Sequence, residues 1–252
     1  MLTRTELEEI AQSISDGNVG HAELLYLQDV LLRTISIETT DELVFKEGTA
    51  LLKCYQLDRF SEDLDFSARN SIDIQGLVEA IERDLNRYGM PADQVDIDRT
   101  ERSISIRFAI QGPLYAETDR SRCYLRLQVN THSSVDSFEL TRYTPPFRDV
   151  PTFDLVVLGE AEILAEKVRA LLTRQQPRDL YDIYHLINRS ITPDPTLIQH
   201  KLDYYDLTYD EEAVIDRAGT FESLWPSLEP LVYSRLPPFE AVMNELAGTF
   251  RT

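Results

Sequence analysis

The segment at residues 43–68, LVFKEGTALLKCYQLDRFSEDLDFSA, constrains the fold of this chain more than any other. It opens with a short apolar run at 43–45, which predicts a strand ending at Gly48. Residues 49–57 follow with a helical pattern, and residues 63–67 alternate polar and apolar side chains as a second strand does. A strand, a tight turn, a helix and a strand in this order predict an α/β domain.

Apolar periodicity extends this prediction along the rest of the chain. We expect helices at residues 4–15, 21–36, 73–88, 160–174 and 178–189, and strands within 94–110, 122–130 and 154–158. Proline and aromatic residues at 143–153 mark a boundary, and after it the pattern becomes mainly helical. The predicted organisation is therefore an α/β domain at residues 1–150 and a mainly helical domain at residues 151–252.

Composition and cysteine content narrow the class of protein. Hydrophobic residues make up 42% of the chain, which is typical of a globular protein. No apolar run approaches the ~20 residues of a membrane span, and the acidic start MLTRTELEEI lacks a signal-peptide core. We therefore expect a soluble, cytoplasmic protein with no membrane partner. Cys54 and Cys123 are predicted to be buried, reduced thiols, and the four scattered histidines do not predict a zinc site.

The net charge of −19 bears on the kind of partner. Such a surface repels nucleic acid unless a local basic patch overrides the repulsion. The basic residues are 4 lysines against 21 arginines, and an acid-rich, lysine-poor surface suits solvation at high salt, as in halophilic proteins. Salt of that strength also screens the repulsion, so the charge does not exclude an RNA substrate.

Asp63 and Asp65 are the candidate metal ligands. They are spaced i and i+2, so on a strand both side chains point to the same face, while the apolar residues beside them point to the core. The Gly48-Thr49 turn opens a helix, where backbone N–H groups and the threonine hydroxyl can receive a phosphate. Two carboxylates beside a phosphate cradle describe a magnesium site for phosphoryl or nucleotidyl transfer. From the pattern alone, a solvated strand edge explains the two aspartates equally well.

Two long blocks of the sequence resemble a known family, the AbiEii-type nucleotidyltransferase toxins, which include the MenT toxins. Residues 45–66 are similar almost position by position to the family's run FKGGTALxKxYxxxRFSEDIDL. Residues 160–187, EAEILAEKVRALLTRQQPRDLYDIYHLI, resemble its AEKLxAL…RDLYDLYxLL helix pair. The resemblance runs from about residue 21 to residue 190. It implies a nucleotidyltransferase (polymerase-beta-like) fold with a mixed sheet, flanking helices and a C-terminal helical domain.

The resemblance also assigns roles to residues. It implies that Asp63 and Asp65 bind Mg²⁺ or Mn²⁺ and that Gly48-Thr49 is the phosphate turn. It further implies that Lys167 reaches into a cleft completed by the C-terminal domain and contacts nucleotide phosphates, with Asp182 nearby as a further active-site acid. The other predicted nucleotide-binding residues are Lys46, Lys53, Ser61 and Arg178.

Two of these positions have structural alternatives. Lys167 lies at the edge of an apolar helix face, so the helix pattern alone favours a solvated lysine, and the resemblance reverses that interpretation. Asp179 is assigned a structural role, because an aspartate at a helix start commonly caps and anchors the helix.

The sequence departs from the family's pattern at two places. Glu47 replaces the usual second glycine, which adds a negative charge beside the phosphate turn and restricts the backbone. On the predicted strand at 122–130, where many nucleotidyltransferases carry a third carboxylate, the candidates are the neutral Gln128 and Asn130. A site with two carboxylates holds a second metal ion less well, which bears on the two-metal form of the mechanism.

The predicted function is that of a toxin of a toxin–antitoxin system. The resemblance implies transfer of a nucleoside monophosphate from an NTP to an RNA acceptor, the tRNA 3′ end, and a separately encoded antitoxin partner. Two alternatives stay open: a catalytically silent nucleotide-binding protein of the same fold, and a nucleotidyltransferase that modifies a small cationic molecule such as an aminoglycoside. Aromatic residues in the tail, from Tyr204 to Phe239, are expected to form the core of a small helical domain and less readily a partner surface.

Overall fold

The computed structural model describes residues 1–132 and 134–251 of the chain. These residues form two compact units. Unit 1 comprises Met1–Cys54 and Phe60–Val157, and unit 2 comprises Tyr55–Arg59 and the chain from Leu158 onward. The chain therefore enters unit 2 briefly at Tyr55–Arg59, returns to complete the sheet of unit 1, and enters unit 2 again after Val157.

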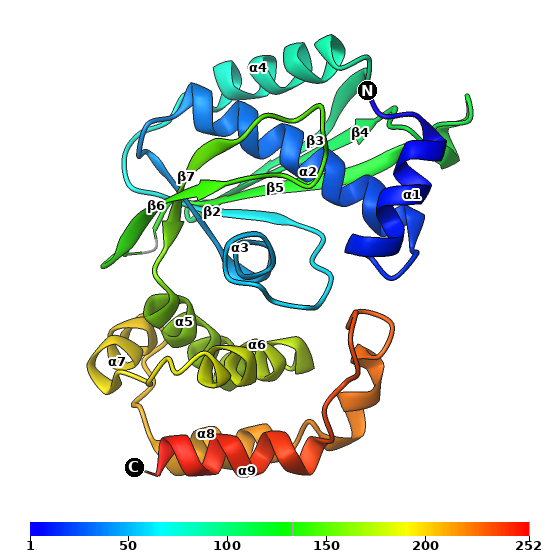
Figure 1. Cartoon of the computed structure of the whole chain (residues 1–252). Helices are drawn as coiled ribbons and strands as arrows, with labels where there is room; N and C mark the ends of the chain where they lie inside the picture. The colour runs from blue at the N-terminus through cyan, green and yellow to red at the C-terminus, as the bar shows by residue number, and fades with distance from the viewer. Residues whose placement is uncertain (133, 252) are drawn as a thin grey trace. The chain divides into compact units, whose positions relative to one another are not determined.

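Within the described residues, unit 1 is built on a mixed seven-stranded sheet with flanking helices, which confirms the predicted fold class (Figure 1). The strands are β1 (Leu43–Lys46), β2 (Leu64–Ala68), β3 (Ala92–Arg99), β4 (Ser103–Ile110), β5 (Cys123–Asn130), β6 (Phe138–Tyr143) and β7 (Phe153–Leu158). Their order across the sheet is β3-β4-β5-β2-β1-β7-β6. β2 runs parallel to β5 and antiparallel to β1, and β1 runs parallel to β7, so the central strands come from distant parts of the chain.

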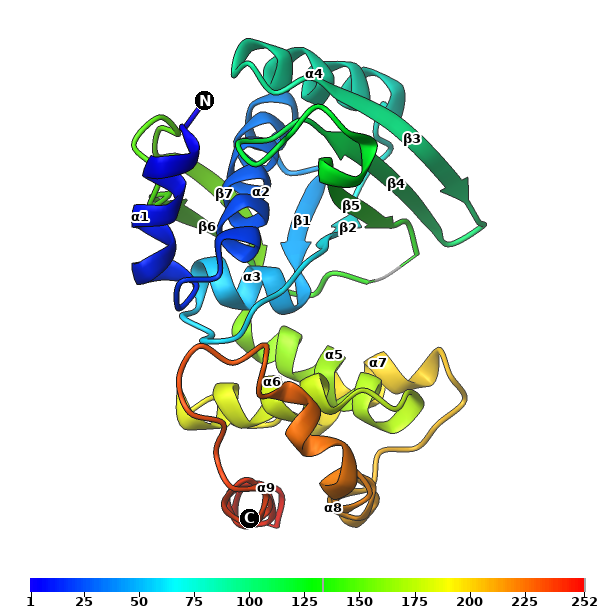
Figure 2. The same cartoon turned by 90° about the vertical axis from the view of Figure 1, so that its right-hand side faces the viewer.

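The α-helices of unit 1 are α1 (Arg4–Ile14), α2 (Val19–Glu38), α3 (Glu47–Cys54) and α4 (Ile74–Arg87). Two of them, α1 and α4, pack against the long, buried α2, whereas α3 packs against β1, β2 and β6. α2 contacts α1, α4 and β5, and Figures 1 and 2 both show it beside α4. A helix enclosed by neighbours on several sides must be apolar around most of its circumference, and α2 is. Its first turn is capped by Asn18, whose side chain accepts a hydrogen bond from the His21 N–H at 3.1 Å.

The two faces of the sheet differ in chemistry. One face is apolar: Phe45 of β1 and Phe66 of β2 are register partners with ring centroids 5.2 Å apart, and Ile106 pairs with Leu127 between β4 and β5. Side chains alternate along a strand, so the intervening residues point to the opposite face. That face carries the register partners Lys46, Asp65 and Gln128.

A buried ion pair joins α2 to α3. The Lys53 ammonium lies 2.7 Å from an Asp29 oxygen and donates to the Leu25 carbonyl at 3.0 Å, and the Tyr143 hydroxyl lies 3.1 Å from both Asp29 oxygens. Burial raises the pKa of Asp29 and lowers the pKa of Lys53, and their mutual attraction opposes both shifts. Because the charged forms have lost their water, this pair connects two helices at an energetic cost.

Unit 2 is helical. Its helices are α5 (Glu160–Thr173), α6 (Pro177–Asn188), α7 (Pro195–Asp203), α8 (Glu211–Gly219), the 3-10 helix η2 (Glu222–Leu228) and α9 (Phe239–Phe250). α5 packs against α6, α7 and α8, and α6 packs against η2 and α9. Phe221 and Trp225 are buried among them, whereas Tyr204 and Tyr205 are 49% and 43% exposed. The aromatic tail is thus partly core and partly surface.

Most predicted elements are present within a few residues of their expected bounds. β6 was not predicted, because its side chains are mostly exposed and its sequence, FELTRY, lacks a clear buried alternation. The turn helix begins two residues earlier than expected, at Glu47. Cys54 and Cys123 are free, and burial raises the pKa of each thiol to about 12. In the described parts of the chain, no helix has the length and apolar character needed to cross a membrane.

We predict that Lys53→Met destabilises the protein by about 3–5 kcal/mol, because it leaves Asp29 charged and buried without its partner. The double variant Asp29→Asn/Lys53→Met removes both charges and should recover part of that loss. Urea unfolding followed by circular dichroism gives the free energies of unfolding. Arg4→Met is the control, since it breaks the exposed Arg4–Glu8 pair and should cost under about 0.5 kcal/mol. Additive losses in the double variant would contradict the prediction.

Candidate active site

Asp65 lies at the centre of the polar face of the sheet. Asp65 is the register partner of Lys46 on β1 and of Gln128 on β5. The side chains of Asp65 and Asp63 are both partly exposed. Asp63 precedes β2 by one residue, and from its i−2 spacing to Asp65 it is predicted to face the same side. The structure therefore brings Lys46 beside the predicted metal pair.

The loop that carries Asp63 is held from two sides. The Thr49 hydroxyl of α3 lies 2.8 Å from the Ser61 hydroxyl and 2.5 Å from the Asp63 carbonyl oxygen, and Thr49 is fully buried. The Gln28 side-chain amide of α2 donates to the carbonyls of Ser61 and Glu62 at 2.9 and 3.0 Å. Two buried polar side chains thus fix the backbone from which the Asp63 carboxylate projects.

Gln28 was missed by sequence reasoning, although a signal was present. Gln28 and Asp29 are adjacent polar residues in the middle of the apolar stretch LLYLQDVLL. Polar side chains in a helix that is otherwise buried are usually retained for a specific hydrogen bond. Here Gln28 holds the aspartate loop and Asp29 holds α3 through Lys53.

Glu47 begins α3 with a backbone φ of 63°, in the left-handed region. This conformation suits glycine, and a residue with a Cβ is strained there. The family's usual second glycine therefore corresponds to a real backbone demand, and Glu47 meets it at a cost. The first-turn N–H groups of α3, at Gly48 and Thr49, remain the predicted phosphate cradle.

Among the described residues, no group of three or more histidine, cysteine, aspartate or glutamate side chains is placed to hold a metal ion. The position beside Asp65 on β5 is occupied by the neutral Gln128, and Asn130 pairs with Ser67 further along. Two carboxylates on one face suit a single Mg²⁺ that completes its octahedral coordination with water and substrate phosphates. The residues present therefore fit one divalent cation at Asp63 and Asp65.

The remaining predicted residues of unit 1 have different surroundings. The Lys53 ammonium is buried against Asp29, and a nucleotide contact by Lys53 remains a prediction. The Ser61 hydroxyl lies against Thr49, in the loop next to Asp63. Lys46 is 6% exposed and lies level with Asp65.

In unit 2, Lys167 and Asp182 belong to a chain of alternating charges that is buried except at Arg174. Arg59 donates two hydrogen bonds to Asp182, both at 2.7 Å, and the Lys167 ammonium lies 3.0 Å from Asp182 and 3.4 Å from Asp179. Arg174 closes the chain with two bonds of 2.7 Å to Asp179. The structure thus joins Arg59, from the early part of the sequence, to the motif at α5 and α6.

The charges of this chain set the ionisation of Asp182. Burial raises the pKa of Asp182, but Arg59 and Lys167 lower it by more, so the net pKa lies below its ordinary value.

Asp179 lies in the first turn of α6, where a carboxylate interacts favourably with the helix dipole. It does not cap the helix, because the N-cap is Gln176 and no side-chain cap hydrogen bond is present among the described residues; Asp179 instead pairs with Lys167 and Arg174. Arg178 is exposed.

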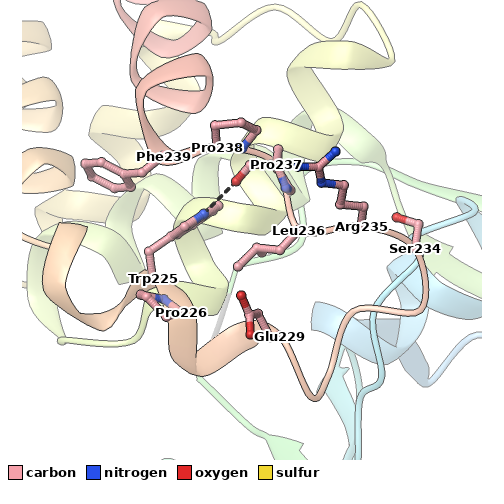
Figure 3. Close-up of a pocket in the computed structure, with 9 residues that line it drawn as sticks. All are labelled: Trp225, Pro226, Glu229, Ser234, Arg235, Leu236, Pro237, Pro238 and Phe239. Atoms are coloured by element: carbon pink, nitrogen blue, oxygen red, sulfur yellow. Dashed lines mark hydrogen bonds between the residues drawn. The ribbon is translucent and has the colours of Figure 1, made fainter.

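Unit 2 also contains a pocket of about 460 Å³ lined mainly by aromatic, leucine and proline side chains (Figure 3). Trp225 forms part of its wall and donates its Nε1–H to the Pro237 carbonyl at 2.9 Å. Glu229 and Arg235 are its charged residues. None of the predicted site residues lines this pocket, so it supplies no part of the candidate active site.

Comparison with known proteins identifies the family. The profile of the family described as "Nucleotidyl transferase AbiEii toxin, Type IV TA system" matches residues 30–244. The chain belongs to the AbiEii family of nucleotidyltransferase toxins. A search of curated protein sequences finds no match for this AbiEii-family protein.

Solved structures share the fold. MenT4, nucleotidyltransferase toxin Rv2826c from Mycobacterium tuberculosis H37Rv, is similar with a TM-score of 0.63 and 23% identity, covering 99% of this chain and 89% of that one. JHP933 from Helicobacter pylori is similar with a TM-score of 0.61 and 18% identity, covering 92% of this chain and 90% of that one. The AbiEii-family assignment makes the protein a nucleotidyltransferase, with an NTP substrate and an antitoxin partner, in agreement with the sequence-based expectation.

We predict that Glu47→Gly raises the free energy of unfolding of this AbiEii-family protein by about 1 kcal/mol, because glycine adopts the positive φ without strain. Glu47→Ala is the matched control, since it removes the same charge but keeps the strained Cβ. Thermal and urea unfolding measure both variants. Equal stability of the glycine and alanine variants would contradict the prediction.

We further predict that Asp182→Asn costs about 3–5 kcal/mol at neutral pH, because Arg59 and Lys167 lose a buried counter-charge. Since the folded pKa of Asp182 is lowered, its stabilisation is complete above the unfolded pKa of about 3.9 and is lost as the pH falls through the folded value. The difference between wild type and variant in urea unfolding should therefore shrink below about pH 4. The exposed Asp216→Asn is the control, and a difference that stays constant with pH would refute the assignment.

Proposed function

We propose that this AbiEii-family protein transfers a nucleoside monophosphate from an NTP to an RNA acceptor, the tRNA 3′ end, with Mg²⁺ as the divalent cation. The observation that carries the proposal is the position of Asp65 on the polar sheet face, with Lys46 beside it and Asp63 on the same side. The antitoxin is proposed to be a separately encoded protein.

Each residue has a physical role in this proposal. Asp63 and Asp65 hold one divalent cation, which when bound offsets negative charge on the triphosphate. The first-turn N–H groups of α3, at Gly48 and Thr49, bind the terminal phosphates. Thr49 also positions Asp63 through the carbonyl contact described above.

The positive side chains complete the nucleotide contacts. Lys46 lies next to the metal pair, and Lys167 is proposed to neutralise the triphosphate while Asp182 holds its ammonium. Lys53, Ser61 and Arg178 are retained as further candidates. The acceptor hydroxyl oxygen then bonds to the α-phosphorus in line and its proton passes to solvent, while the bond from the α-phosphorus to the bridging oxygen breaks and pyrophosphate leaves with that electron pair.

We expect purified protein, incubated with each α-labelled NTP, Mg²⁺ and total tRNA, to place label on the tRNA. The assay is run at low and at multimolar salt, because the charge of −19 suits a high-salt environment. Asp63→Ala and Asp65→Ala should each lower the rate by about 10³-fold or more, since each removes a metal ligand. Asp154→Ala, an exposed carboxylate of β7, is the matched control and should act as wild type.

The controls separate the parts of the proposal. Periodate-oxidised tRNA lacks the 3′-terminal diol and should accept no label if the 3′ end is the acceptor. Label on an aminoglycoside but not on tRNA would replace the RNA acceptor with a small molecule. Full activity in both aspartate variants would refute the metal site. NTP binding without transfer would indicate a catalytically silent protein, and Glu47 and Gln128, which depart from the family's pattern, would then be the first residues to substitute.

A further inference from the structure

Two arginines lie side by side on the polar face of the sheet, next to the candidate metal pair. Arg107 of β4 and Arg126 of β5 are direct register partners, and both are exposed. Arg126 stands two residues before Gln128 on the same strand, so it points to the same face as Gln128 and Asp65. Because Leu127 pairs with Leu64, Arg126 is level with Asp63.

This arrangement is unfavourable in the protein alone. Like charges directly opposite each other on an antiparallel pair destabilise it. Among the described residues, no carboxylate forms an ion pair with either guanidinium group, although Asp96 of β3 is the next register partner of Arg107. In a chain with a net charge of −19, two adjacent arginines that have no ion-pair partner in the described part of the chain are a local exception to the acidic surface.

An aromatic ring orients one of the two arginines. The Arg107 guanidinium lies over the ring of Tyr124, 4.5 Å from its centroid, and Tyr124 itself is 44% exposed. Tyr124 pairs in register with Ala109 and stands two residues before Arg126, so the three side chains share one face. Arginines with an adjacent exposed ring are the combination that binds single-stranded nucleic acid.

We propose that Arg107 and Arg126, with Tyr124 as a positioning residue, form the site that holds the acceptor RNA strand. We call these three residues the β4–β5 platform. The strand lies across it with backbone phosphates on the two guanidinium groups, and its 3′ hydroxyl points toward Asp63 and Asp65. The proposal rests on the proposed function for the direction of the strand, but the binding itself is independent of catalysis.

The position of the platform favours the acceptor over the NTP as its ligand. Arg126 lies about 7 Å along β5 from Gln128, and Arg107 is one further strand, about 4.8 Å, away. The proposed triphosphate contacts lie on the opposite side of β2, at Lys46 of β1 and the start of α3. The two ligands therefore approach the metal pair from different strands. Regularly spaced backbone phosphates also explain why two cationic side chains stand side by side. The carboxylates of an acidic antitoxin segment would be spaced less regularly and would explain this pair less well.

The test is the binding of a 5′-fluorescein single-stranded oligoribonucleotide of about 12 nucleotides, measured by fluorescence anisotropy without NTP. Arg107→Gln and Arg126→Gln should each weaken binding by about tenfold at low salt. The slope of log affinity against log salt concentration should fall by about 0.7 for each lost phosphate contact and by about 1.4 in the double variant. Tyr124→Phe keeps the ring and should bind as wild type, whereas Tyr124→Ala should weaken binding by several-fold.

Two further variants make the test independent of misfolding. Arg99→Gln removes an exposed arginine of β3 whose register partner, Ile104, belongs to the opposite face, so it should leave binding unchanged. Asp96→Asn removes the acidic register partner of Arg107 and should tighten binding by about threefold, a gain that a damaged fold cannot produce.

The outcomes distinguish this proposal from the proposed function. Unchanged RNA affinity and salt slope in the double arginine variant would overturn the platform, as would an equal loss of NTP affinity, which would assign the arginines to the nucleotide. Loss of antitoxin binding with full RNA affinity would reassign the face to a protein partner and also overturn it. Arginine-dependent RNA binding without any nucleotidyl transfer would support the platform and refute the proposed function instead.

Discussion

The rest of the candidate site depends on the hydrogen bonds that fix the loop before β2. A metal pair needs its two carboxylates on one face, but Asp63 lies outside the strand and could turn away. Thr49 and Gln28 prevent this by bonding the backbone of Ser61, Glu62 and Asp63 from two helices. Both side chains are buried, so the contacts are not weakened by competition with water. The helix α3 therefore carries the predicted phosphate-binding residues and also holds the loop of the predicted metal ligand Asp63.

The lysines of this chain occupy buried positions. Each of the four lysine side chains is less than a tenth exposed, and Lys53, Lys167 and Lys201 pair with buried carboxylates. Arginine supplies the positive charge of the surface. The presence of lysine and not arginine at positions 46, 53 and 167 is therefore explained first by enclosure, since an ammonium needs less space than a guanidinium. Enclosure and function are compatible for Lys46 and Lys167, which lie beside Asp65 and Asp182 respectively.

Positive side chains on the polar sheet face would allow a strongly acidic protein to bind an anionic substrate. The net charge of −19 sets a repulsive field, yet field strength at short range depends on the nearest groups. Arg107 and Arg126 supply two positive charges at exposed positions of the sheet face that carries Asp65. High salt screens the long-range repulsion, and it also weakens each arginine–phosphate contact. The acidic surface and an RNA acceptor are thus physically consistent.

The sequence by itself determined the α/β class and the strand–turn–helix–strand unit, because these follow from local periodicity and spacing. It predicted that Asp63 and Asp65 share one face, but Asp63 lies outside β2, and the loop that carries it is held by tertiary contacts with Thr49 and Gln28. The family blocks added Lys167 and Asp182, but not their environment. Tertiary structure alone decided that Gln28 holds the aspartate loop, that Arg59 pairs with Asp182, and that Arg107 stands opposite Arg126. Each joins residues 19 to 123 positions apart, and strand order and helix packing, not local pattern, bring such residues together. The sequence likewise did not predict β6, because an exposed edge strand buries too few side chains to show an alternating apolar pattern.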